Sequence, residues 1–324
     1  MLMSLCRGFA MAGGLVLAAQ VAQADTLRLA HASSSTSLIQ AAAQHFADTL
    51  AAETKGGLTV TIFPDGQLGD EGPIADGVGA GSIDIGLGGV ADAIDPRLNV
   101  VTLPFLFADA KAAHDFLDGP VGQKVFATGG DNGFVMLGAL DSGFRQFATT
   151  KAPIASPADL KGLKIRTPPN PVILATMETL GALPQSIPFG EVYTSLQSHV
   201  VDGVEPEMRD FWDQKWYESA KFLTVSNYIW TPNYWFMNKE RFDGLSPENQ
   251  TALRKAAAET TTWYRGELDG VYAKVTEDLK AKGVSVSTVD PAAFRAMVDP
   301  VYAKFAAEWG ADYVAEVRKA ATSE

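Results

Sequence analysis

Hydrophobic and polar positions alternate between strand and helix periods along the first part of the chain. Residues 26–31 repeat with a period of two and predict a strand, residues 38–54 repeat with the helical period, and residues 58–63 predict a second strand. A helix reaching about residue 77 and a strand at 82–87 follow. This β-α-β-α-β order predicts a parallel sheet with helices on its faces.

A second stretch of the chain repeats the same order. A helical pattern over residues 111–129 leads to a strand at 134–140, and residues 159–204 again read as β-α-β-α-β. The aromatic-rich stretch 221–238 is prone to form a strand and is long enough to return from the second unit to the first. We therefore predict an α/β protein with two similar lobes.

One long helical pattern dominates the C-terminal part. Ser246 followed by Pro247 is typical of an N-cap and a first helical position, and the pattern continues without proline to about residue 282. Such a helix exceeds the usual length of about 8–20 residues, and we expect it to lie across both lobes. A short strand at 284–287 and a final pair of helices from residue 290 complete the expected elements.

The first 24 residues have the parts of a secretory signal peptide. Arg7 is the positive flank, residues 9–19 are apolar, and residues 22–24 have a small-x-small pattern. The apolar run is shorter than the about 20 residues that span a membrane. We expect cleavage before Asp25, a periplasmic protein and no insertion into the membrane. The single cysteine, Cys6, would leave with this segment.

Composition and charge narrow the class of partner. A hydrophobic content of 47% is ordinary for a packed protein, whereas a net charge of −12 opposes binding to nucleic acid or anionic lipid. The four histidines lack metal-binding spacing, and no nucleophile motif or catalytic cysteine is present. The residues favour a binding protein without cofactor over an enzyme. A pocket for an anion would have to supply its own cations.

Arg166 is the strongest candidate for such a cation. Residues 163–166 read as a short strand, and the prolines at 168, 169 and 171 end it, so that Arg166 lies at the carboxyl end of a strand and close to the next helix. Ligands of open α/β sheets collect at that end, and a guanidinium group matches a carboxylate or phosphate. The spacing alone leaves open a plain surface arginine.

Several segments carry a family resemblance. Residues 161–166, 191–197 and 201–205, in this order, resemble the core motif of the periplasmic solute-binding proteins of TRAP transporters, the DctP family. The resemblance implies a two-lobed periplasmic binding protein of the type II-like class, with the long helix spanning both lobes. Further segments that resemble family blocks, in family order, are residues 64–71, 81–85, 103–107, 143–146 and 245–250. The lobe boundaries that we predict are residues 25–143 plus 233–270 for lobe I and residues 144–232 plus 271–324 for lobe II.

The resemblance also implies which side chains bind the ligand. Arg166 matches an arginine that forms a two-pronged pair with a ligand carboxylate, and Arg145 matches a second arginine that reaches the same group. For most of the other positions a packing or capping role is the alternative. The remaining ligand contacts that we predict, the last as an aromatic ring able to stack on a sugar, are Phe189, His31, Glu71, Glu205 and Tyr234.

Departures from the family pattern bear on the ligand. Pro206 follows Glu205 where relatives carry asparagine or tryptophan, which removes the match to relatives that bind 2-oxo acids through a metal, so we predict no metal. Relatives that bind sugar acids with an amino group carry a glutamate where this chain has glycines at 88–89, and this departure disfavours a ligand such as sialic acid. Carboxylates such as Glu71 that face an anion need hydrogen-bond donors, and the hydroxyl groups of a sugar acid supply them. We predict a hexuronate or a related sugar acid.

The role implied by the resemblance is capture of this acid by closure of the lobes. Delivery to the small and large membrane subunits of a TRAP transporter, which use an ion gradient, would follow, and we expect a monomer. Three alternatives stay open: an aromatic, hydroxy or oxo carboxylate as the ligand, a periplasmic lyase that uses Glu205 and His31, and a sensor that presents its closed form to a receptor.

Overall fold

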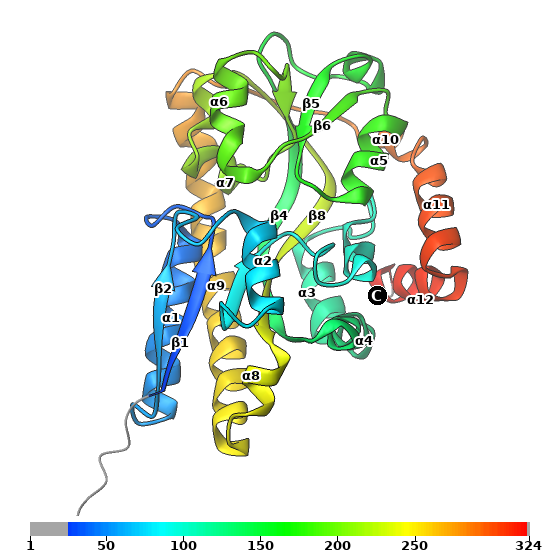
Figure 1. The fold of residues 1–324 in the computed structure, drawn as a ribbon. Helices are drawn as coiled ribbons and strands as arrows, with labels where there is room; N and C mark the ends of the chain where they lie inside the picture. Colours follow the sequence, from blue (N-terminus) through cyan, green and yellow to red (C-terminus); the bar gives the residue numbers. More distant parts are fainter. Residues whose placement is uncertain (1–24, 323–324) are drawn as a thin grey trace, which may run out of the picture.

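The structure, a computed structural model, describes residues 25–322, so the predicted signal peptide lies outside the described residues. Two lobes lie one above the other (Figure 1), and one mixed sheet with strand order β2-β1-β3-β8-β4-β7-β5-β6 runs through both, with β9 paired to β8. The strands are β1 (Asp25–His31), β2 (Leu58–Phe63), β3 (Ile85–Gly88), β4 (Phe134–Thr149), β5 (Lys164–Thr167), β6 (Leu183–Ser186), β7 (Gly203–Val204), β8 (Phe222–Asn238) and β9 (Ser285–Thr288). The α-helices are α1 (Leu38–Glu53), α2 (Glu71–Gly79), α3 (Ala110–Asp118), α4 (Pro120–Ala127), α5 (Pro171–Thr179), α6 (Val192–Gln197), α7 (Met208–Asp213), α8 (Lys239–Asp243), α9 (Pro247–Ala281), α10 (Ala292–Arg295), α11 (Asp299–Trp309) and α12 (Ala311–Thr322).

Lobe I is built on β1, β2 and β3 as the alternation predicts. β1 pairs in parallel with both β2 and β3, and β3 pairs antiparallel with the end of β8. Leu27 and Leu29 of β1 are fully buried, whereas Arg28 between them is exposed, which is the alternation expected of a strand with one face on the core. The buried leucines pack in one cluster with Phe46 of α1.

Lobe II repeats this arrangement. β5 lies between β6 and β7 and pairs in parallel with both. Asn170 caps α5 by accepting hydrogen bonds from the backbone of Val172 and Ile173, and Pro171 takes the first helical position. Arg166 is the second-to-last residue of β5 and lies close to the start of α5, as the sequence predicts.

The two lobes share the long strands β4 and β8. These strands pair antiparallel over most of their length, with register shifts that include one between Asp141 and Gly143. The predicted strand at 134–140 is too short, because the segment that reads as a turn is an irregularity inside a continuous strand. Gly143 has φ 110°, and a Cβ atom there would lie 1.8 Å from the hydroxyl oxygen of Tyr272 on α9. Only glycine fits this crossing between lobes.

The helix α9 has the predicted length and place. Its N-cap Ser246 accepts a hydrogen bond from the backbone of Asn249 at 3.3 Å, and Pro247 is its first residue. It packs on α1 and β4 in lobe I and on α7 and β9 in lobe II, and thus spans both lobes (Figure 1). Within residues 25–322, no helix is both long and apolar enough to cross a membrane.

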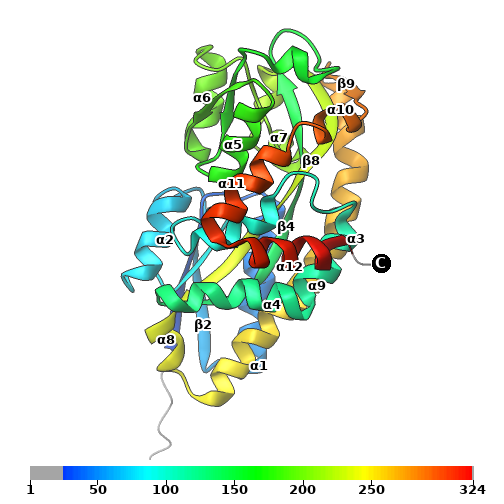
Figure 2. The ribbon, with the colours of Figure 1, turned by 90° about the vertical axis from the view of Figure 1, so that its right-hand side faces the viewer.

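The C-terminal helices cross from one lobe to the other (Figure 2). α11 packs against α5 of lobe II, whereas α12 packs against α3 and α4. Val314 and Val317, one turn apart on α12, are buried, and Tyr313 donates a hydrogen bond to the carbonyl oxygen of Arg97 at 3.2 Å. The predicted boundary placed residues 271–324 in lobe II, but the apolar face of α12 lies on the lobe I side.

Candidate functional site

A cavity lined by residues of both lobes lies between them. Its lining comes from the sheet crossing, by which we mean residues 142–145 of β4 and 231–233 of β8, where these strands pass from one lobe to the other. Loops of lobe I and residues of β5 and α7 complete the lining. Within residues 25–322, no group of three or more metal-ligating side chains could hold a metal ion. The polar and charged members of the lining are Ser33, Glu71, Ser142, Arg145, Arg166, Asn170, Glu207, Asp210, Thr231 and Asn233.

Arg166 presents an unpaired fork to this cavity. Its side chain is buried, its Nε donates to the carbonyl oxygen of Ile187 at 2.9 Å, and its Cζ lies 5.7 Å from the ring centre of Trp216. No residue of the described chain accepts from its two terminal nitrogens. Burial, together with the charge of Arg145, lowers the pKa of Arg166 to about 10, so the group remains charged at neutral pH. The protein supplies a buried cation without an anion.

Arg145 also lines the cavity, but the protein neutralises it. Its Nε and Nη2 both donate to Glu205, the latter at 2.9 Å, and its Nη1 donates to Glu207 at 2.5 Å. Burial alone would lower the pKa of Arg145, yet the two carboxylates hold it above its usual value. A guanidinium group has five N–H donors, so two of them remain for a ligand. Arg145 and Arg166 thus line the same cavity, but the charge of Arg145 is paired with two carboxylates, whereas that of Arg166 is not.

Glu205 lies behind Arg145 and outside the cavity lining. Its carboxylate accepts from Arg145 and from the hydroxyl of Tyr228 at 2.5 Å, and the residue is fully buried. Burial raises its pKa against the opposing effect of Arg145. The direct ligand contact predicted for Glu205 is therefore not what the structure shows, because its oxygens are used to hold the arginine in place.

Glu71 lies in the cavity at the first position of α2. Its Oε1 accepts a hydrogen bond from the backbone of Gly89 at 2.9 Å, and burial raises its pKa to about 7. A Cβ atom on Gly88 would lie 3.0 Å from the same oxygen. The glycines after β3 thus leave room for the Glu71 side chain, a connection that the sequence alone does not reveal.

Phe189 lines the cavity, as predicted, and contacts the edge of the Trp216 ring at 5.4 Å between ring centres. His31 ends β1 as predicted but is buried outside the lining, with its Nε2 at 2.9 Å from the side-chain oxygen of Gln40. Burial lowers the pKa of His31. The imidazole therefore supports the start of α1, and Ser33 lies in the cavity in its place.

Tyr234 is the second predicted contact that the structure places elsewhere. It is buried in β8, and its hydroxyl donates to the carbonyl oxygen of Leu98 at 2.9 Å. Successive side chains of a strand point to opposite faces, and here Asn233 is the one that faces the cavity. Of this adjacent pair, Asn233 and not the predicted Tyr234 lines the cavity.

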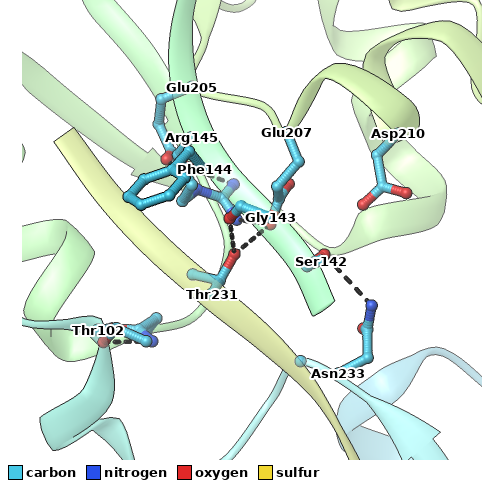
Figure 3. Close-up of polar contacts among 12 residues, drawn as sticks. Thr102, Ser142, Gly143, Phe144, Arg145, Glu205, Glu207, Asp210, Thr231 and Asn233 are labelled. Carbon is cyan, nitrogen blue, oxygen red and sulfur yellow. Dashed lines mark hydrogen bonds and ion pairs between the residues drawn. The ribbon is translucent and has the colours of Figure 1, made fainter. Parts of the chain in front are cut away.

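Sequence reasoning missed several polar residues that Figure 3 shows around the sheet crossing. Glu207 accepts from Arg145 and from the hydroxyl of Thr231, and its backbone forms an isolated bridge with that of Arg145. The sequence signal for Glu207 was its position two residues after Glu205, a spacing at which both carboxylates can reach the same arginine. Two further residues in this group, Asp210 and Ser142, also line the cavity.

Asp70 makes one of the hydrogen bonds that join the two lobes. The Oδ1 atom of Asp70 caps α2 by accepting from the backbone of Glu71 at 2.7 Å, and its Oδ2 accepts from the backbone of Gly190 in lobe II at 3.1 Å. The same side chain therefore supports a helix in one lobe and holds the other lobe near it.

We expect Asp70→Asn to weaken ligand binding by about three- to tenfold, mainly through faster dissociation, because it removes one hydrogen bond to a charged group from the closed form alone. The asparagine oxygen can still cap α2. Asp76→Asn removes the same charge from an exposed position of α2 and is the control. Stopped-flow measurement of dissociation tests this, and equal rates for both variants would contradict it.

Solved structures of similar chains define the fold. The chain is 33% identical to a TRAP periplasmic solute-binding protein from Xanthobacter autotrophicus Py2, with a TM-score of 0.86 and coverage of 90% of this chain and 99% of that one. It is 31% identical to one from Roseobacter denitrificans, with a TM-score of 0.88 and coverage of 93% and 100%. Their structures contain bound β-D-galacturonate and β-D-glucuronate, respectively. The predicted two-lobed fold is thereby confirmed.

Curated relatives agree with the structures. The chain is 37% identical over 267 residues to the 2,3-diketo-L-gulonate-binding periplasmic protein YiaO of Escherichia coli K12, covering 82% of this chain and 81% of the relative. The family described as bacterial extracellular solute-binding protein, family 7 (DctP), matches residues 29–308. Its members are substrate-binding components of transporters and not enzymes, so the predicted lyase alternative falls away. The chain belongs to the DctP family of TRAP periplasmic solute-binding proteins, as its motifs predict.

Proposed function

We propose that the protein captures a hexuronate or a closely related sugar acid by closure of its lobes. The observation that carries this proposal is the unpaired fork of Arg166 in a cavity whose other charged groups are mostly carboxylates. A carboxylate on the ligand fits the fork bidentately. Arg145 has two N–H groups left for the same carboxylate or for a neighbouring oxygen.

The acceptor groups of the cavity support the sugar part of the ligand. Glu71, Glu207 and Asp210 all line the cavity, and a ligand without donors would leave them facing an anion. The hydroxyl groups of a sugar acid donate to such oxygens. Relatives whose names or structures include 2,3-diketo-L-gulonate, galacturonate and glucuronate are consistent with this chemistry.

The proposal extends to location and partners. Residues 1–24 have the pattern of a signal peptide for export to the periplasm, where the related proteins act. The closed, loaded form would dock as a monomer on the small and large membrane subunits of a TRAP transporter, which release the acid into an ion-gradient-driven path. Neither closure nor docking makes or breaks a covalent bond.

We expect D-galacturonate or D-glucuronate to bind at least about tenfold more tightly than succinate, benzoate or phenylacetate, because each buried acceptor left unpaired costs about 1–3 kcal/mol. Calorimetric titration should use protein freed of co-purified ligand by unfolding and refolding. An aromatic acid that binds more tightly than every sugar acid would overturn the sugar assignment and would instead implicate Trp216 and Phe189.

A further inference from the structure

Arg209 and Asp210 are neighbours on α7 that the motif analysis does not use; Arg209 has no role in the function proposed above, and Asp210 enters it only as one of several acceptors. Resting on the proposed function, we propose that Asp210 is a specificity-determining residue. It accepts a hydrogen bond from a sugar hydroxyl on the part of the ligand that lies against α7 and the sheet crossing. Arg209 is the positioning residue that holds it there.

Asp210 has one oxygen fixed and one oxygen free. Its Oδ1 accepts two hydrogen bonds from Arg209, from Nε at 3.1 Å and from Nη2 at 2.7 Å. Its Oδ2 has no hydrogen-bond partner among residues 25–322, although the residue is only 9% exposed and lines the cavity. Figure 3 shows this carboxylate directed toward the space that Asn233 and Ser142 also border. A carboxylate oxygen that faces a cavity without a protein partner is available to accept a hydrogen bond from a ligand.

Ser142 and Asn233 complete a group suited to a hydroxyl. The Oγ of Ser142 accepts from Arg209 at 3.4 Å and from the amide of Asn233 at 3.2 Å. Within the described chain its own proton and the Asn233 side-chain oxygen have no partners. A hydroxyl group both donates and accepts, so a ligand hydroxyl that donates to Asp210 can accept from Ser142 at the same time. A carboxylate or a methyl group cannot do both.

Arg209 fixes this group independently of any ligand. It is almost fully buried, and besides Asp210 its Nη1 contacts the hydroxyl of Tyr264 on α9 and the carbonyl oxygen of Asp141 at 3.5 Å. The guanidinium group thus connects α7, α9 and β4. A fork held on three elements keeps Asp210 in one rotamer before the ligand arrives.

The test compares D-galacturonate with glycolate, which carries a carboxylate but only one hydroxyl. For Asp210→Asn we expect galacturonate to bind at least about tenfold more weakly while glycolate changes by less than about threefold. Asp213→Asn is the matched control, because Asp213 is on the same helix but lines a separate hollow beside α1 and α9. This control should change neither affinity.

Two outcomes would overturn the inference. Asp210→Asn that binds galacturonate as tightly as the parent would show that Asp210 serves only as the counter-ion of Arg209. Equal losses for galacturonate and glycolate would show a general structural effect. A parent protein that binds no sugar acid at all would overturn the proposed function itself, and the inference with it, so the two failures are distinguishable.

Arg209→Lys tests the positioning role. Lysine keeps the charge but cannot make two bonds to one carboxylate while also contacting Tyr264. We expect the ratio of galacturonate to glycolate affinity to fall as it does for Asp210→Asn. A lowered melting temperature with an unchanged ratio would mean that Arg209 stabilises the fold without setting specificity, which would overturn this part of the inference.

Discussion

Replacing Arg166 by alanine will abolish binding of the acid and leave the fold intact. Truncating one partner of a buried charge pair costs about 2–5 kcal/mol, which takes micromolar binding to the millimolar range. The fold should tolerate the change because Arg166 donates to a single protein group, Ile187, and forms no ion pair within residues 25–322. Its lowered pKa means that the unliganded folded state disfavours this charge. The free variant should therefore be as stable as the parent or more so.

Calorimetry with D-galacturonate and thermal unfolding of the free protein measure the two parts of this expectation. Arg166→Lys should lose almost as much affinity, since a point charge does not replace a planar fork. Arg254→Ala, at an exposed position of α9, is the control. Binding by Arg166→Ala within about threefold of the parent would refute the assignment of the carboxylate to Arg166.

Arg145→Met should have the largest effect on stability, about 3–5 kcal/mol, because it leaves the buried carboxylates of Glu205 and Glu207 without their shared cation. The loss should depend on pH. Burial raises the pKa of Glu205 even beside Arg145, whereas Arg145 helps to hold the pKa of Glu207 below its usual value against burial. Without the arginine, burial is less opposed and the folded pKa values of both carboxylates rise. The folded state then binds more protons than the unfolded state, so stability falls as pH rises above the unfolded pKa.

Urea unfolding at about pH 5 and about pH 7 measures this difference, which should be greater at the higher pH. Arg145→Met combined with Glu205→Gln should recover part of the stability, since one buried charge is gone. Equal losses at both pH values would argue that Arg145 contributes by packing and not by charge.

Periodicity predicted most elements, because their burial is one-sided. Leu27 and Leu29 of β1 and the capped start of α9 at Ser246 are local signals that tertiary contacts do not override. The predicted end of the strand at residue 140 was wrong, because the polar residues and glycine at 141–143 read as a turn. In the structure the neighbouring strand β8 supplies its hydrogen-bond partners, and this pairing is not encoded locally.

The motifs predicted residues that line the cavity where they fix a single position, and they did not do so where the result depends on the direction of a side chain. Arg166, Arg145, Glu71 and Phe189 line the cavity. For Tyr234 the face of the strand decided the outcome, and only the paired structure sets that face. The sequence analysis did not select Arg209 and Asp210 of α7. The departure from the family pattern at Pro206 removes the match just before this helix but does not indicate which residues take over the family contacts.

The sheet joins strands that are far apart along the chain, and this affects the order in which the protein can fold. Ile85 of β3 pairs with Met237 of β8, and α12 covers lobe I only after the last residues are made. A chain that emerges from the ribosome N-terminus first therefore cannot complete lobe I until synthesis is nearly finished. Pairings of such long range form slowly. Late completion therefore keeps a nascent chain incompletely folded for longer.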